Sequence, residues 1–370
     1  MSITNKFAIL VRMEGEFDAS GRAVAMTLVQ EGEKALRSGL PNAGLEARRL
    51  FEEALRGDYG SKAAKFALKS LLWWQRRLED YAPSANGPEK GRAIVDEWKG
   101  FYRFLNDIGG VGGIDDAGWD ALRAVRYWVC AAAREAFDYN ALNPSQSGDW
   151  GIQFKLGLCH KGLGDYENAC AFLDVAAGFK QDDVPLLFER ADVKALAAER
   201  DARPDGEARL IFREAFLAAP QEACVYSMES AFFRGLYHAV AERGYEGDEI
   251  LEWMPVWGTL LGAFPFKCEL NQIKLGKLKG RVFELENEFK AEGGPGSRNS
   301  EGRLVPRLLN GYFWLLEHYE ASRQREKSRH GLDRLVEETL LKIEWTCSGT
   351  RSIPEQVMQS RYFADFGRNW

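Results

Sequence analysis

Two stretches of this 370-residue chain carry the same order of small and large residues, and this repetition limits the folds that the chain can adopt. The first stretch contains Leu156–Gly157, then Gly164–Asp165–Tyr166, then Ala169, Leu173 and Ala176. The second contains Arg190–Ala191, then Ala208, Phe212 and Ala215. Arg190–Ala191 follows Leu156–Gly157 by 34 residues, and the second triplet follows the first by 39 residues. Because each triplet has the spacing i, i+4, i+7, it forms one stripe of a helix, and each stretch predicts two helices joined by a turn.

The start of the first stretch is ambiguous when taken alone. From Trp150 to Leu158 apolar and non-apolar residues alternate, which fits one face of a half-buried strand. The same residues also fit a helix, in which Trp150, Phe154 and Leu158 share a stripe. The helical spacing downstream favours a helix here as well. Gly157 then lets a neighbouring helix approach closely, at a cost of about 1 kcal/mol in helix propensity.

These residues resemble the tetratricopeptide repeat, a helix-turn-helix unit of about 34 residues. The resemblance is clearest over Trp150–Pro220, where Pro220 closes the second unit as the family pattern expects. Extra residues at the Pro204–Asp205–Gly206 turn account for the larger second offset. The resemblance implies an all-α fold, a TPR-like α-α superhelix, with these repeat-packing residues: Leu156, Gly157, Tyr166, Ala169, Leu173, Ala176, Ala191, Ala208, Phe212, Ala215 and Pro220.

The resemblance also implies a function and a surface. Stacked repeats form a solenoid whose concave wall is lined by the first helix of each unit, and such walls bind proteins or peptides. The partner-binding residues expected on that wall are Phe154, Leu158, Lys161, Phe188 and Asp192. The three apolar members of this set fit core packing equally well. We therefore expect a protein- or peptide-binding scaffold, with these residues as candidate contacts.

Glycine- and proline-containing stretches divide the chain into three predicted regions. Residues 1–144 form a helical region with degenerate repeats, residues 145–290 the repeat region, and residues 303–370 a C-terminal helical cap and tail. The glycine-rich stretch Ala291–Arg303 separates the last two. A short strand-like segment, Lys6–Met13, precedes the helical part.

Charge and composition exclude several classes of partner. The net charge of −6 comes from 49 basic and 55 acidic residues, which favours neither nucleic acid nor an anionic membrane surface. The basic residues between Lys267 and Arg281 are typical of a solvated helix face. The apolar run Phe7–Val11 is too short for a secretory signal or a membrane span. Six cysteines without CxxC spacing predict reduced thiols in a cytoplasmic protein.

No motif for catalysis or for metal binding stands out. The four histidines, His160, His238, His318 and His330, lie far apart and form no HExxH pair. We expect no enzyme activity, no cofactor and no metal. One alternative is a helical sensor that holds a small molecule or peptide in an aromatic-lined pocket, since the chain has eleven tryptophans. A less favoured alternative is an enzyme whose site is assembled across helices without a motif.

Overall fold

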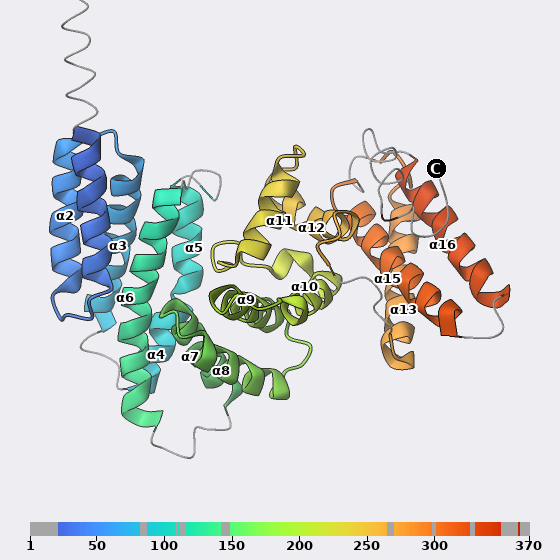
Figure 1. Cartoon of the computed structure of the whole chain (residues 1–370), viewed down its shortest axis with the longest axis horizontal. Helices are drawn as coiled ribbons and strands as arrows, with labels where there is room; N and C mark the ends of the chain where they lie inside the picture. The colour runs from blue at the N-terminus through green and yellow to red at the C-terminus, as the bar shows by residue number, and fades with distance from the viewer. Residues whose placement is uncertain are drawn as a thin grey trace, which may run out of the picture. The chain divides into compact units, whose positions relative to one another are not determined.

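The computed structural model describes residues 21–81, 87–108, 110, 116–141, 149–264, 270–297, 301–325, 330–348 and 362. Over these residues the chain is built from helices and the turns between them, without a strand (Figure 1). The all-α prediction is therefore confirmed for this part of the chain, while the strand-like segment Lys6–Met13 lies outside it. The chain divides into two compact units, Met1–Phe179 and Lys180–Trp370.

The first unit begins with a helix over residues 21–36. It continues with α2 (Ala43–Gly57), α3 (Lys62–Tyr81), α4 (Pro88–Asp96), α5 (Trp98–Asp107), α6 (Asp116–Ala141), α7 (Trp150–Gly162) and α8 (Tyr166–Phe179). The turn before α2 contains Gly39, whose positive φ of 69° other residues adopt only with strain. In the core of this unit the Trp74 ring lies 4.6 Å from that of Trp98 and 5.4 Å from that of Phe101.

Helices α7 and α8 pack as an antiparallel pair and settle the ambiguity of the Trp150–Leu158 stretch in favour of a helix. The Asp149 side chain begins α7 by accepting a hydrogen bond from the Gly151 amide at 2.9 Å. Gly164, with a φ of 72°, makes the turn. A Cβ on Gly157 would lie 2.6 Å from Leu173 Cδ2, so glycine is what allows the two helices to come this close.

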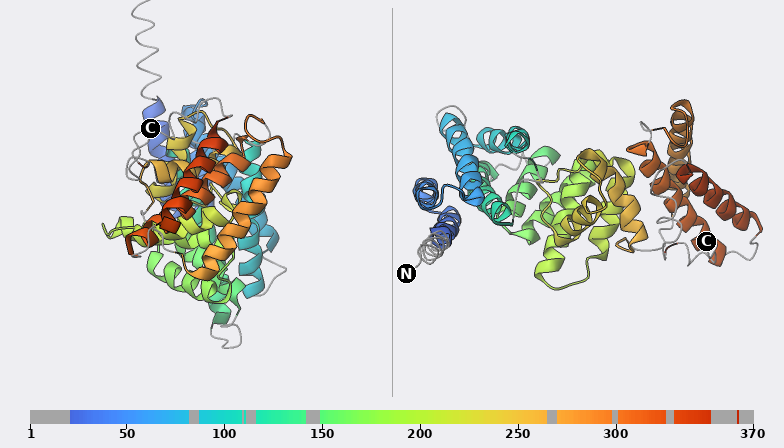
Figure 2. Two further views of the ribbon diagram at one scale, coloured as in Figure 1. Left: turned by 90° about the vertical axis from the view of Figure 1, so that its right-hand side faces the viewer. Right: turned by 90° about the horizontal axis from the view of Figure 1, so that it is seen from above.

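The second unit holds the remaining helices. They are α9 (Val184–Arg200), α10 (Gly206–Ala218), the 3₁₀ turn η3 (Pro220–Glu222), α11 (Ala231–Ala241), α12 (Asp248–Leu260), α13 (Gln272–Ala291), α15 (Leu304–Arg325) and α16 (His330–Cys347). Helices α9 and α10 pair, and α15 packs against both α13 and α16 (orange to red in Figure 2). The core of this unit is rich in large rings, among them Phe212, Phe216, Trp253 and Trp314.

A buried ion pair joins α10 to α15. The Arg213 guanidinium donates to both carboxylate oxygens of Glu317 at 2.6 Å, and both side chains are only 1% exposed. The guanidinium also lies over the Trp314 ring, 4.6 Å from its centroid. The Tyr362 hydroxyl donates to the same carboxylate at 3.3 Å. This bidentate buried pair fixes the position of α10 on α15.

The two predicted repeats fall in different units, because the division lies between α8 and α9. Each helix pair is observed, while their stacking into one superhelix stays a prediction, as do the predicted regions 1–144, 145–290 and 303–370. Among the described helices, none combines the length and the apolar character that a membrane crossing requires. The five cysteines in the described ranges are free thiols, and Cys268 lies outside those ranges.

Candidate functional pocket of the second unit

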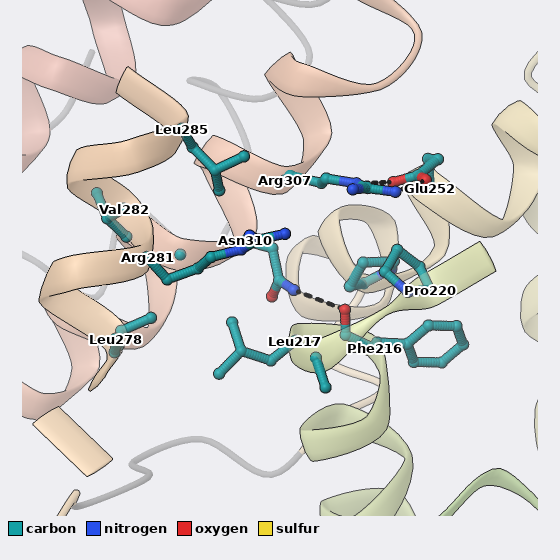
Figure 3. A pocket seen from close by; sticks show the side chains of 13 residues that line it. Phe216, Leu217, Pro220, Glu252, Leu278, Arg281, Val282, Leu285, Arg307 and Asn310 are labelled. Carbon is teal, nitrogen blue, oxygen red and sulfur yellow. Dashed lines mark hydrogen bonds and ion pairs between the residues drawn. The ribbon is translucent and has the colours of Figure 1, made fainter. Parts of the chain in front are cut away.

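A small pocket, with room for about one water molecule (about 20 Å³), lies in the second unit where four helices and η3 meet. Its walls come from the end of α10, from η3, and from α12, α13 and α15 (Figure 3). Most of the lining is apolar, with Phe216 and Leu217 on one side and Leu278, Val282 and Leu285 on the other. Four polar side chains interrupt this lining: Glu252, Arg281, Arg307 and Asn310. An apolar hollow with a few convergent polar groups is the usual form of a ligand site.

Two local features of the sequence build the walls. Helix α10 ends at Ala218 because Pro220, the first residue of η3, has no amide N–H and redirects the chain. Pro220 is buried and lines the pocket. On the opposite side, a Cβ on Gly311 would lie 2.7 Å from Val282 Cγ2, so this glycine allows α13 to pack closely on α15. The two packing features bring α10, α13 and α15 around one hollow.

Asn310 is the most informative residue of the pocket. Its side chain is 3% exposed, and its Nδ2 donates to the Phe216 carbonyl at 3.5 Å, the long limit for such a bond (Figure 3). Its Oδ1 is buried without a hydrogen-bond partner among the described residues. A buried acceptor left unpaired costs about 1–3 kcal/mol, so the site carries an unused binding capacity for a donor.

The two arginines of the pocket differ in their charge balance. Arg307 Nε donates to Glu252 Oε2 at 2.8 Å, and this hydrogen bond raises the Arg307 pKa, so its charge is already matched. Arg281 extends from α13 into the same hollow (Figure 3), and its side chain is 50% exposed. Among the described residues, its one ion-pair partner is Glu284 at 3.8 Å. Arg281 therefore gives the pocket a positive charge that a ligand anion can neutralise.

A second and larger hollow, of about 270 Å³, lies between α13 and α16 over α15. Its polar groups are already paired. The Tyr312 hydroxyl donates to Glu286 at 3.0 Å, Lys342 donates to the same carboxylate at 2.7 Å, and Arg334 holds Glu338 at 2.7 Å. Burial, with the negative charge of Glu286 beside the ring, raises the pKa of Tyr312 and keeps it a donor. This hollow offers less free hydrogen-bonding capacity than the Asn310 pocket.

The partner-binding residues predicted from the sequence do not form one exposed surface. Phe154 and Leu158 are partly exposed on α7, whereas Lys161, Phe188 and Asp192 are buried. Both carboxylate oxygens of Asp192 accept backbone amides before α11, from Glu229 at 2.9 Å and Ser230 at 3.0 Å. Asp192 therefore stabilises the start of α11, and the buried members of the set lack the accessibility that a partner contact requires. Phe154 and Leu158 stay predictions.

The predicted repeat-packing residues lie in the interior of the helix pairs. All are buried except Tyr166, which is half-buried. The pocket residues, in contrast, were not predicted. Arg281 was predicted as part of a solvated basic face, and its exposed side chain agrees with that prediction. For Asn310 a signal existed, because it is a lone polar residue in the apolar run of α15, and a buried polar residue is more informative than an exposed apolar one.

The described residues contain no group of three or more potential metal ligands. No protein-family model, curated protein or solved structure matches this chain.

Proposed function

We propose that this protein binds a segment of a partner polypeptide and that the Asn310 pocket receives it. An apolar side chain of the segment enters between the Leu217 wall and the Val282 wall. A backbone N–H of the segment donates to Asn310 Oδ1. The protein acts as a binding scaffold and carries out no reaction at this site.

The observation that carries the proposal is the unpaired, buried Oδ1 of Asn310. A peptide supplies the two groups that the pocket lacks, an apolar side chain for its walls and an N–H for its acceptor. The hollow itself has room for about one water molecule, about 20 Å³, so the side chains around it must move apart to admit a ligand. A small molecule with an apolar part and one hydrogen-bond donor supplies the same two groups, so a small-molecule sensor is the second candidate function.

The test replaces the acceptor and measures binding and stability together. Asn310→Leu removes the unpaired oxygen, so the variant is expected to be as stable as the wild type or more so. Binding of fluorescein-labelled heptapeptides, measured by fluorescence polarisation, is expected to weaken about tenfold or more, since each 1.4 kcal/mol lost is a factor of ten. Loss of binding without loss of stability is the signature of a binding residue.

The matched control is Asn287→Leu, the same substitution at an exposed position of α13 that does not line the pocket. It is expected to leave peptide affinity unchanged. If no peptide in a randomised pool binds the wild type while a metabolite pool quenches its tryptophan fluorescence saturably, the small-molecule function replaces this one. Equal peptide affinity of the wild type and Asn310→Leu refutes the assigned site.

A further inference from the structure

We infer that the larger hollow over α15, which we call the α13–α16 groove, docks one amphipathic helix of a partner protein. An acidic residue of that helix lies beside Lys279. The groove belongs to the second unit and shares one lining residue, Val282, with the Asn310 pocket. This docking therefore goes beyond the proposed function and does not depend on it.

Three helices, α13, α15 and α16, give the groove its shape (orange to red in Figure 1). The lining residues of α13 have the spacing i, i+3, i+4, i+7: Lys279, Val282, Phe283 and Glu286. Those of α16, within 335–342, have the same spacing, and those of α15 lie within 312–319. Residues so spaced share one face of a helix, and each stripe is about 10 Å long. Three helical faces that meet along one groove leave the place of a fourth helix in a bundle.

The polar groups of the groove favour a helix over an extended segment. The two carboxylates of the lining, Glu286 and Glu338, are held in the ion pairs described above. The Thr339 hydroxyl donates to the Leu335 carbonyl within α16 at 2.7 Å. An extended segment brings backbone N–H and C=O groups that need partners in the groove, whereas a helix pairs its own backbone groups. A groove with its polar groups already paired therefore suits the apolar stripe of a helix.

The apolar surface of the groove is open to a partner. Phe283 lines the groove and is 64% exposed, so its ring is available for contact. Tyr312, Leu315 and Tyr319 form the floor on α15 and are nearly buried. The groove holds about 270 Å³, more than ten times the room of the Asn310 pocket. It therefore admits groups far larger than a water molecule.

Charge determines which kind of helix fits. The Lys342 ammonium pairs with Glu286 at 2.7 Å. Lys279, in contrast, has no ion-pair partner among the described residues, and its Nζ lies 5.4 Å from the centroid of the Tyr319 ring. Lys279 is thus the unmatched charge of the lining. A helix with a Glu or Asp beside its apolar stripe neutralises it, so an acidic amphipathic helix is the complementary partner.

The experiment measures fluorescence polarisation of labelled peptides with the full chain. One pool holds blocked, alanine-rich peptides of about 18 residues, with a randomised apolar stripe at helical spacing and glutamates beside it. A second pool has lysine in place of the glutamates, and a third has a central proline, which breaks a helix. The glutamate pool is expected to bind at least about threefold more tightly than the lysine pool and at least about tenfold more tightly than the proline pool.

Variants of exposed residues on α13 locate the site. Lys279→Glu is expected to reverse the charge preference, so that the lysine pool binds more tightly than the glutamate pool. The matched control Lys277→Glu, at an exposed position outside the groove, is expected to keep the wild-type preference. Phe283→Ala is expected to weaken binding about tenfold or more. Its control is Ile273→Ala, at a 73% exposed residue that does not line the groove, and it is expected to leave binding unchanged.

The outcomes decide between the possible occupants. Absence of binding, or equal binding of the glutamate and proline pools, overturns the helix assignment, and an unchanged charge preference in Lys279→Glu overturns the acidic partner. If sedimentation velocity shows a dimer that Phe283→Ala dissociates, the groove joins two copies of this chain instead. If octanoate, a free alkyl carboxylate, binds as tightly as the best peptide, the occupant is a small amphiphile. The proposed function is tested separately, by heptapeptide binding to Asn310→Leu.

Discussion

Replacing Gly157 by alanine tests whether helix propensity or helix packing decides stability in the α7–α8 pair. Propensity alone predicts stabilisation, because alanine is better than glycine in a helix interior by about 1 kcal/mol. The structure predicts the opposite. The new Cβ would lie 2.6 Å from Leu173 Cδ2 and 2.7 Å from Leu173 Cγ, both closer than real Cβ contacts allow.

The magnitude follows from how little Leu173 can move. Its side chain is 0% exposed, and the contact involves Cγ as well as a terminal methyl, so a simple rotation of the end does not relieve it. Overpacking of this kind costs about 1–3 kcal/mol. After subtraction of the propensity gain, we expect Gly157→Ala to lower the free energy of unfolding of the first unit by up to about 2 kcal/mol.

The matched control is Gly178→Ala in the partner helix α8. Gly178 is exposed, and a Cβ there meets no atom within 4 Å, so propensity acts alone and the variant gains up to about 1 kcal/mol. The assay is guanidinium unfolding followed by circular dichroism, with hydrogen exchange of α7 and α8 peptides to localise the change. If Gly157→Ala raises the unfolding midpoint as much as Gly178→Ala does, the packing argument is wrong.

Two further substitutions test buried charges. Arg213→Met leaves the Glu317 carboxylate buried without its cation and is expected to destabilise the second unit by about 3–5 kcal/mol. In urea unfolding, the double variant Arg213→Met/Glu317→Leu is expected to recover most of this loss. Equal losses of stability in the single and double variants would contradict the prediction. In the first unit, burial and the nearby Asp120 raise the pKa of Glu33 to about 7, so the folded state favours its neutral form. The contribution of neutral Glu33 to the free energy of unfolding is complete below pH ~4.5 and decreases, by at most about 3 kcal/mol, as the pH rises to ~7. Glu33→Gln is expected to remove this decrease in stability between pH ~4.5 and ~7, measured by denaturant unfolding at a series of pH values. If the pH dependence of the variant equals that of the wild type, the role of Glu33 is refuted.

The sequence alone determined the local structure of this protein. Helical spacing predicted α8 and α10, and Pro220 marked the end of α10. Gly157 was predicted as a close-approach position, and the Leu173 contact bears this out. These features depend on residues a few positions apart, so periodicity and turn chemistry are enough to reveal them.

Only the tertiary structure decided which distant residues meet. Asn310 bonds to Phe216 across 94 positions, and Arg213 to Glu317 across 104, and no periodicity links residues so far apart. The structure also buried Phe188 and Asp192, which the resemblance to the repeat family had placed on a partner-facing wall. Whether a side chain on a helix faces solvent, a neighbour or a pocket depends on how the helices pack, and packing is set by the summed contacts of the whole unit.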